Sequence, residues 1–182
     1  MTDSFFGHLV RVRDALAGDA AAIAAVHVAS WRAAYVGLLP DIVLDGLSVA
    51  QRARHWRHVL APDSGDRVVV AESDGQLLGF AQVGPATDAD AGPTTGQLAT
   101  LYVRPEAWGS GVGTLVHDAG LDRLAGDGCD RAVLWMLSTN ARAAQFYERE
   151  GWLREEKIRV QQFGGAVVID HRYARALLNC TA

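Results

Sequence analysis

The sequence is poor in cysteine, in lysine and in uninterrupted apolar runs. Its two cysteines, Cys129 and Cys180, lie outside any CxxC motif, and Lys157 is the single lysine among 17 basic residues. Widely separated cysteines give no disulfide framework, which suits a reducing cytoplasm. No apolar run approaches the roughly 18–20 residues of a membrane span, so we expect no membrane partner. The opening MTDSFFGHLVRVRD lacks the pattern of a secretory signal, and we therefore predict a cytoplasmic protein.

The net charge and the spacing of the histidines argue against a nucleic-acid partner and against a metal site. A formal net charge of −4 argues against a nucleic-acid partner bound through a broad basic surface. His55 and His58 lie three residues apart with no third ligand in view, so we expect no metal. An apolar fraction of 49% and a charged fraction of 21% are typical of globular proteins. We expect residues 1–182 to form one domain, either monomeric or homodimeric.

The apolar periodicity predicts a mixed α/β (α+β) domain in the order β-α-α-β-β-β-α-β-α-β-β. Asp19 and Asn140 are expected N-caps, and Gly151 is the expected C′ residue of the last helix. Asp74-Gly75 and Phe163-Gly164-Gly165 are expected to turn two hairpins. We expect strands over residues 9–13, 67–72, 77–83, 97–103, 132–137, 152–162 and 166–174, and helices over residues 19–35, 48–59, 111–124 and 141–150.

Three alternating glycines, Gly109, Gly111 and Gly113, stand between an expected strand and an expected helix. A Walker A loop would need a lysine here, and none is near. A dinucleotide fingerprint would need glycine where Thr114 stands, and the acids that should end the next strand precede it. Two interpretations stay open: a pyrophosphate held by backbone amides at the helix N-terminus, or glycines that let the helix pack closely on the sheet.

At these glycines the sequence resembles the GNAT superfamily, the acetyl-CoA-dependent GCN5-related N-acetyltransferases. The stretch WGSGVG, residues 108–113, is similar to the family signature [QR]-x-x-G-x-[GA]. The stretch NARAAQFYEREGW, residues 140–152, is similar to the family helix N-x-x-A-x-x-F-Y-x-x-x-G-[FW]. The element order also matches the GNAT fold, a mostly antiparallel mixed sheet flanked by helices, so the resemblance covers nearly the whole chain.

The resemblance implies an N-acetyltransferase that passes the acetyl group of acetyl-CoA to a primary amine of a small molecule, protein or peptide by direct attack in a ternary complex. It assigns Tyr147 as the general acid that protonates the departing thiolate. Trp31 and Tyr35 share one helical face and either line the acceptor pocket or pack the core, and Glu72 on a neighbouring strand is a further candidate to reach the acceptor through water. The residues expected to hold the cofactor are Leu101, Tyr102, Val103, Trp108, Gly109, Ser110, Gly111, Val112, Gly113, Thr114, Asn140, Ala143 and Tyr147.

The sequence departs from the family pattern at two positions of the signature and on one strand. Trp108 replaces the usual Gln or Arg and Ser110 the frequent Arg, so we expect backbone amides to carry more of the binding, assisted by Arg104 or Arg142. The fourth expected strand, residues 97–103, lacks the glutamate that many relatives use as a base. The alternative function is a non-catalytic acyl-CoA-binding or regulatory module on the same fold.

Overall fold

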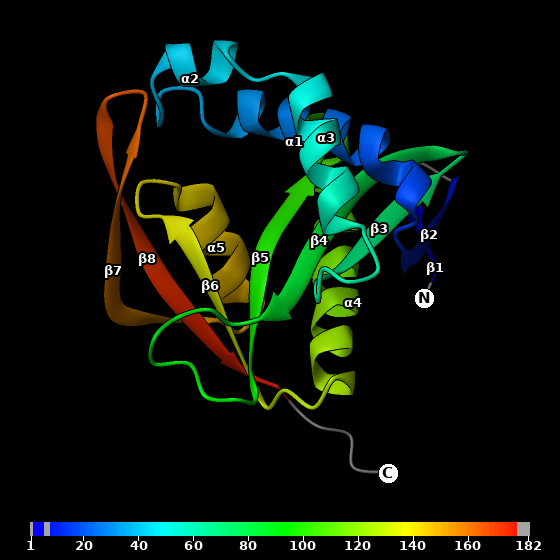
Figure 1. Cartoon of the computed structure of the whole chain (residues 1–182). Coiled ribbons are helices and arrows are strands. Elements are labelled where there is room, and N and C mark those ends of the chain that lie inside the picture. The colour runs from blue at the N-terminus through cyan, green and yellow to red at the C-terminus, as the bar shows by residue number, and fades with distance from the viewer. Residues whose placement is uncertain (1, 6–7, 178–182) are drawn as a thin grey trace.

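Eight strands form one sheet, in the order β1-β2-β3-β4-β5-β6-β8-β7, in the computed structural model, which describes residues 2–5 and 8–177 (Figure 1). Every neighbouring pair is antiparallel except β5 and β6, which are parallel. The strands are β1 (Thr2–Phe5), β2 (His8–Asp14), β3 (Arg67–Ser73), β4 (Gln76–Pro85), β5 (Thr95–Val103), β6 (Arg131–Leu137), β7 (Leu153–Phe163) and β8 (Ala166–Ala176).

Five α-helices accompany these strands in the described residues, which confirms the predicted mixed α/β class. They are α1 (Ala20–Ala34), α2 (Asp41–Asp45), α3 (Val49–Val59), α4 (Val112–Gly126) and α5 (Ala141–Arg149). None of them is long and apolar enough to cross a membrane. Cys129 is a buried free thiol, and Cys180 lies outside the described residues.

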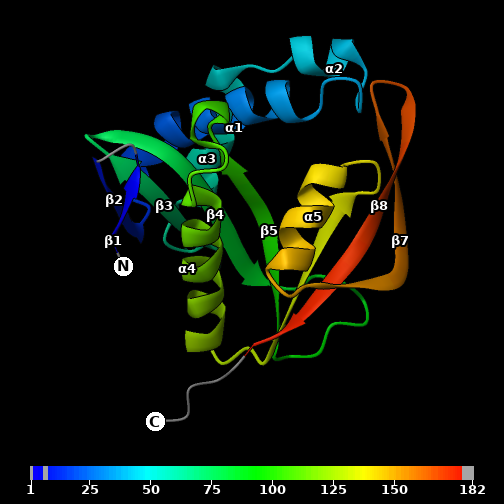
Figure 2. The same ribbon diagram turned by 180° about the vertical axis from the view of Figure 1, so that it is seen from behind.

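The helices cover both faces of the sheet, so each central strand is buried on two sides. Figures 1 and 2 show α1 and α3 on one face of β3 and β4 and α4 on the other. Along β3, Val68 and Val70 belong to the core cluster under α1 and α3, while Val69 and Ala71 belong to the cluster under α4. This alternation follows from the two-residue period of a strand. Consecutive apolar residues are therefore what a doubly covered strand requires.

Three local features differ from the sequence expectations. Strand β1 and helix α2 were not predicted: each has only four or five residues, too few for a periodic signal, and β1 is held by pairing with β2. Asp19 precedes α1 but does not cap it with its side chain. Its carboxylate instead accepts from the Leu16 amide and pairs with Arg13. The caps expected at Asn140, which accepts from the Ala143 amide, and at Gly151, with φ 80°, are confirmed.

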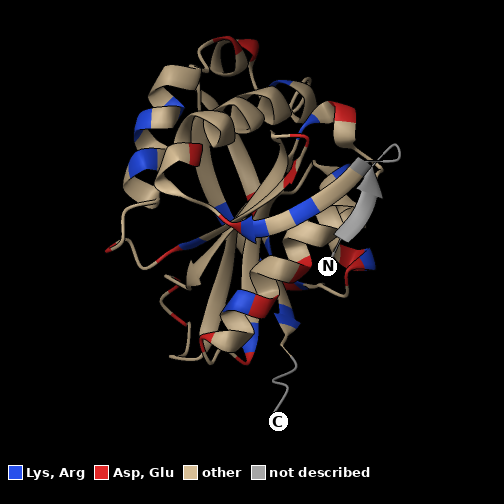
Figure 3. Ribbon diagram, turned by 90° about the vertical axis from the view of Figure 1, so that its right-hand side faces the viewer, with Lys and Arg blue, Asp and Glu red and all other residues tan. Residues whose placement is uncertain are grey.

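Charged residues of both signs are spread over the described surface. Figure 3 shows basic residues along α3 and a mixture of acidic and basic residues over the rest of that face. Many of them form ion pairs between elements, such as Arg67 with Asp127 and Arg123 with Asp14. The face drawn in Figure 3 therefore offers no broad surface of one sign.

His27 is a buried imidazole in the core between α1, α3 and the sheet. It is 5% exposed, and its Nδ1 accepts a hydrogen bond from the Trp56 indole N–H at 3.3 Å. The rings of Trp31, Phe80 and Tyr102 surround it, with the Tyr102 centroid at 4.9 Å. Burial lowers the pKa of His27 to about 3, and the charges of Arg52 and His55 act in the same direction. His27 is therefore neutral in the folded protein at neutral pH.

This buried imidazole predicts an acid-dependent loss of stability. In the unfolded chain His27 has an ordinary histidine pKa of ~6.5. Between about pH 6.5 and pH 3 its imidazole is therefore protonated in the unfolded chain and neutral in the folded chain. The free energy of unfolding should therefore fall as the pH is lowered through this range. The variant His27→Phe should lose about 1 kcal/mol per pH unit of that slope.

Urea unfolding at pH 7, 5.5 and 4.5 measures the effect. His58→Gln, on the exposed side of α3, is the matched control and should keep the wild-type slope. Equal slopes for His27→Phe and the wild type would show that His27 takes up its proton in the folded state.

Candidate active site

A cavity of about 670 Å³ opens where β5 and β6 separate. Their recorded pairing covers Thr95–Gln97 of β5 and Arg131–Val133 of β6, and the two strands then diverge, as Figure 1 shows. Strand β5 keeps its antiparallel pairing with β4 up to Val103, with Ala99 as an extra residue in a bulge. The second half of β5 therefore carries backbone polar groups with no ladder partner on the β6 side.

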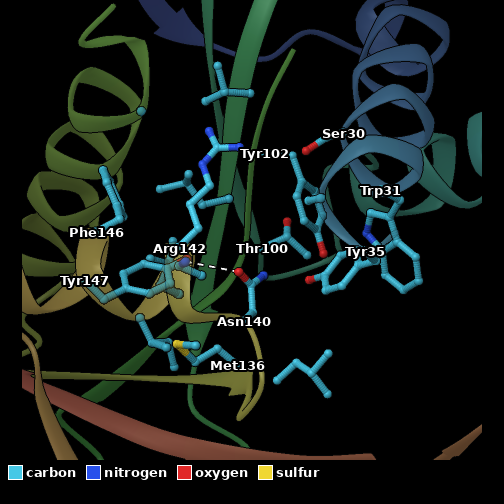
Figure 4. Close-up of a pocket in the computed structure, with 18 of the residues that line it drawn as sticks. Ser30, Trp31, Tyr35, Thr100, Tyr102, Met136, Asn140, Arg142, Phe146 and Tyr147 are labelled. Atoms are coloured by element: carbon cyan, nitrogen blue, oxygen red, sulfur yellow. Dashed lines mark hydrogen bonds between the residues drawn. The ribbon is translucent and has the colours of Figure 1, made fainter. Parts of the chain in front are cut away.

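Two ends of the cavity differ in chemistry, and we name them by their lining. The glycine-loop half is lined by Leu101, Val103, Trp108, Gly109, Gly111, Gly113, Thr114, Asn140, Arg142, Ala143, Phe146 and Tyr147. The aromatic half is lined by Ser30, Trp31, Ala34, Tyr35, Leu39, Tyr102, Arg159, Gln161, Phe163 and Asp170. Figure 4 shows the labelled members of both groups around one continuous space.

The glycine loop places the N-terminus of α4 at the cavity. Gly109 and Gly111 have φ values of 79° and 89°, in the left-handed region that favours glycine. The first amide of α4 to find a backbone carbonyl is that of Leu115, which donates to Gly111 at 3.1 Å. The amides of Val112, Gly113 and Thr114 are thus the unsatisfied donors of a helix N-terminus. These N–H groups and the helix dipole favour an anion at this position.

Each glycine of the motif has its own physical reason. A Cβ on Gly109 or Gly111 would meet nothing within 4 Å, so only backbone conformation requires glycine there. A Cβ on Gly113 would lie 3.4 Å from the Phe146 ring, so Gly113 allows α4 to approach α5 closely. Backbone conformation therefore accounts for Gly109 and Gly111, and contact with Phe146 accounts for Gly113.

The other loop residues take part through the backbone more than through the side chain. The Val112 side chain is fully buried in the core, and the Ser110 hydroxyl donates to the Ala107 carbonyl at 2.7 Å. Neither side chain lines the cavity. Thr114 does line it, with its hydroxyl donating to Glu150 at 3.0 Å.

Trp108, the least typical residue of the motif, forms a fixed platform for Arg142. Its indole N–H donates to the Val103 carbonyl at 2.8 Å, and the Arg142 guanidinium carbon lies 3.3 Å from the ring centroid. This hydrogen bond occupies one of the β5 carbonyl groups expected to be available. Arg142 extends from the first turn of α5 into the cavity (Figure 4). Arg104 instead donates to the Leu77 carbonyl at 2.7 Å and does not line the cavity, so of the two candidate arginines the structure brings only Arg142 to the site.

Asn140, Ala143 and Tyr147 lie on the helix α5 side of the cavity. The Asn140 side-chain oxygen is occupied by the Ala143 amide at 3.1 Å, which leaves its NH₂ group as the free donor (Figure 4). The Tyr147 ring packs edge-on against Phe146 and Trp152. Burial raises the pKa of Tyr147, and the nearby Tyr102 acts in the same direction. Its phenol is therefore protonated at neutral pH.

The aromatic half brings together Trp31 and Tyr35 of α1, Tyr102 of β5 and Phe163 of β7. The Trp31 ring lies 5.0 Å from Tyr35, 6.4 Å from Tyr102 and 6.3 Å from Phe163, measured between centroids. Figure 4 shows the hydroxyl groups of Tyr35 and Tyr102 turned toward one another. Burial raises the pKa of both tyrosines. The Trp31 indole N–H is buried without an acceptor among the described residues.

Glu72 was expected near the acceptor, and the structure does not bring it there. Its carboxylate pairs with Arg13 at 2.7 Å, and it does not line the cavity. Glu72 faces β2, where the register aligns it with Arg11. Strands β4 and β5 stand between β3 and the opening, which keeps Glu72 away from the cavity.

Asp170 lines the cavity and was missed by the sequence analysis. It lies on β8, is 6% exposed and is paired with Arg159 at 2.8 Å. The available signal was positional, because Asp170 stands two residues after buried Val168 and so shares its inward face. A carboxylate on the buried face of a strand is rare enough to indicate a role.

Among the described residues, one group gathers potential metal ligands: His117, Asp118 and Glu150. Hydrogen bonds within the protein explain why these three side chains lie close together. His117 Nε2 accepts from the Trp152 indole N–H at 2.8 Å, and His117 Nδ1 is 2.7 Å from Asp118. Glu150 accepts from Thr114. The imidazole thus joins α4 to the start of β7.

Comparison with known proteins agrees with this geometry. The model of the acetyltransferase (GNAT) family matches residues 23–152. The Bacillus subtilis protein named uncharacterized N-acetyltransferase YuaI is 30% identical over 133 residues, 72% of this chain and 74% of that protein. An N-acetyltransferase structure from Staphylococcus aureus has a TM-score of 0.73 at 16% identity, covering 93% of this chain and 99% of that one. The Salmonella typhimurium protein yncA, solved with its cofactor acetyl-CoA, has a TM-score of 0.69 at 21% identity, covering 95% and 96%.

The family match spans most of α1, the glycine loop and α5, whereas β7 and β8, which carry Gln161, Phe163 and Asp170, lie beyond it. The similar structures share the fold over nearly the whole chain. The chain belongs to the GNAT family of acetyl-CoA-dependent acetyltransferases.

Proposed function

We propose that this protein transfers the acetyl group of acetyl-CoA to a primary amine in a ternary complex, with acetyl-CoA in the glycine-loop half and the amine in the aromatic half. The observation that carries the proposal is the continuity of the cavity. Tyr147 of one half lies near enough to Tyr102 of the other to raise its own pKa further. A donor in one half can therefore meet an acceptor in the other.

The cofactor half fits a long, anionic, amide-rich molecule. The backbone groups of Leu101, which point away from β4, are suited to the amides of the pantetheine arm, and the Asn140 NH₂ group can add a bond. The α4 amides and Arg142 are suited to the pyrophosphate. Trp108 holds the guanidinium by stacking, which limits the entropy that Arg142 would lose on binding.

The transfer step needs a proton for the thiolate and a route for two protons from the amine. An ammonium loses one proton to water before its nitrogen bonds to the carbonyl carbon. The C–S bond then breaks, and the thiolate takes a proton from Tyr147, whose raised pKa keeps it protonated until then. The amide nitrogen sheds its second proton, which restores Tyr147. The balance is one CoA thiol and one proton released per amide formed.

Thiol release distinguishes catalysis from the non-catalytic alternative. Purified protein is titrated with acetyl-CoA by calorimetry and assayed for amine-dependent thiol release with arylalkylamines, polyamines, amino acids and short peptides. We expect binding together with turnover of at least one amine class. Binding of acetyl-CoA without turnover of any class would favour the acyl-CoA-binding module, and no binding at all would exclude both functions.

The first prediction concerns the general acid. Tyr147→Phe should lower kcat by about 10–10³-fold, the range expected for loss of general acid catalysis, because the thiolate must then leave unprotonated or through water. The acetyl-CoA Kd should change little, since the ring remains in place. Single-turnover thiol release isolates the chemical step, and an unchanged single-turnover rate would remove Tyr147 from the mechanism.

The second prediction concerns the loop conformation. Gly111→Ala places a side chain at φ 89°, and the resulting strain of about 1–2 kcal/mol, together with a methyl group at the anion site, should raise the acetyl-CoA Kd at least tenfold. Gly128→Ala is the matched control. Gly128 has φ 87° with equally open surroundings, but it follows the C-terminus of α4, so the same strain should leave the Kd unchanged. Equal Kd values for both variants would separate the loop from cofactor binding.

The third prediction concerns Arg142. Arg142→Met keeps an apolar stem against Trp108 but removes the charge, and should raise the CoA Kd by about 10–100-fold, as loss of a charge-assisted hydrogen bond would. The same loss with 3′-dephospho-CoA would assign Arg142 to the pyrophosphate and not to the 3′-phosphate. Arg57→Met, on exposed α3, is the control and should have no effect. An unaltered Kd for Arg142→Met would exclude the contact.

A further inference from the structure

Asp170 is the only carboxylate among the described residues that line the cavity, and one of its oxygens is free. Oδ2 accepts from Arg159 through Nε at 3.2 Å and Nη2 at 2.8 Å, and also from the Gln161 amide. No hydrogen bond to Oδ1 is formed within the part of the chain that the structure describes. The donors gathered on Oδ2 fix the orientation of the carboxylate and leave Oδ1 for a ligand.

A carboxylate oxygen that is open to a cavity and has no protein donor can accept a charge-assisted hydrogen bond from a ligand there. The Asp170 side chain is 8% exposed, whereas that of Arg159 is 45% exposed and lies over the Trp135 ring at 4.9 Å. Solvent therefore screens the arginine charge more than the carboxylate charge. The inner side of the pair remains attractive to a cation.

The walls beside Asp170 suit an apolar or aromatic body attached to that cation. Trp31, Tyr35 and Phe163 present ring surfaces, and rings attract both apolar groups and cations. Arg159 is the basic side chain that lines the cavity beside Asp170, and its Nε and Nη2 are already bonded to the Asp170 carboxylate. An acceptor with a carboxylate or phosphate of its own would have to compete with Asp170 for this guanidinium.

The outer end of the aromatic half is closed by the tip of the β7–β8 hairpin. A Cβ on Gly164 would lie 2.5 Å from Val43 and 3.2 Å from Ile42, so the tip packs directly on α2. Leu39, Leu44 and Val168 form a buried cluster beneath this contact. An extended peptide would need this passage open, whereas a small molecule would not.

We propose that Asp170 binds the ammonium group of the acceptor, and that the acceptor is a small monoamine with an apolar or aromatic body. This inference rests on the proposed function, because the amine is an acceptor only if the protein transfers an acetyl group. Binding of the amine at Asp170 can be measured without that reaction. Amino acids are disfavoured as acceptors because Arg159 is already paired with Asp170, and lysine side chains and protein N-termini are disfavoured because the hairpin tip packs on α2.

The test uses 2-phenylethylamine as the probe with the CoA-saturated protein. Calorimetry should show binding of 2-phenylethylamine, at least tenfold weaker binding of phenylalanine and of 2-phenylethanol, and no binding of an alanine-initiated tetrapeptide. Phenylalanine adds a carboxylate to the same body, and 2-phenylethanol removes the ammonium. Failure of 2-phenylethylamine to bind, or tighter binding of the tetrapeptide, would overturn the proposal.

Substitutions identify the residue. Asp170→Asn should weaken 2-phenylethylamine about 10–100-fold, because a charge-assisted bond is lost, and Asp170→Glu should recover part of this affinity. Glu155→Gln is the matched control: it removes a hairpin carboxylate that pairs with Arg131 and Arg172 away from the cavity, and should leave amine binding unchanged. Equal affinities for Asp170→Asn and the wild type would overturn the assignment.

Kinetics separate binding from folding. In Asp170→Asn the KM for 2-phenylethylamine should rise with little change in the KM for acetyl-CoA, while phenylhydrazine, whose amine is neutral at pH 7, should be affected less. If thermal melts show that Asp170→Asn does not fold, Ala34→Phe, which fills the aromatic half from α1, should abolish amine binding and keep acetyl-CoA binding. Retained amine binding in Ala34→Phe would overturn the proposal.

The two proposals fail in different ways. Binding of 2-phenylethylamine that depends on Asp170, without thiol release from acetyl-CoA by any amine, would contradict the proposed function alone. Turnover of other amines that is indifferent to Asp170→Asn would contradict the acceptor assignment alone.

Discussion

The separation of β5 from β6 after Gln97 and Val133 is the constraint on which the site depends. Two parallel strands that stayed paired would fill the space between them with their own hydrogen bonds. Because the strands diverge, the hydrogen bonds between β5 and β6 are not formed beyond Gln97 and Val133. Other parts of the structure satisfy some of the backbone groups left free. The bulge at Ala99 bends β5 while it remains bonded to β4, and Trp108 supplies a donor to the Val103 carbonyl. The remaining polar groups of β5 face a cavity in which an amide-rich ligand can pair with them.

The cavity opened by this separation has two walls that favour ligands of opposite charge. On one side, glycines at positive φ expose the amides of α4, and stacking on Trp108 aims the Arg142 charge, so this wall attracts anions. On the other side, a ring cluster and one fixed carboxylate attract a cation with an apolar body. Attraction of opposite charges to the two walls favours simultaneous occupancy, which direct transfer requires.

Much of this arrangement was predictable because it depends on local sequence. The strands, the long helices and the Asn140 cap follow from periodicity and capping chemistry, which act over a few residues. The glycine loop was located by its spacing, although the sequence could not show that Gly113 serves packing while Gly111 serves conformation. Strand β1 and helix α2 escaped prediction because elements of four or five residues are stabilised by tertiary partners more than by propensity.

The sequence alone could not predict which side chains from distant strands lie close together in the fold. Glu72 and Asp170 are both acids on strands; the sequence analysis selected Glu72, whereas the structure places Asp170 at the cavity. Which of them reaches the cavity depends on sheet order, since β3 is separated from the opening by two strands while β8 borders β6. That order is a long-range property and has no local signature. The ion pair with Arg13 makes Glu72 part of the scaffold, whereas three donors on a single oxygen leave Asp170 with an unsatisfied acceptor. A fixed carboxylate with one oxygen open to a cavity can accept a hydrogen bond from a ligand, and this physical argument separates two acids that look alike in the sequence.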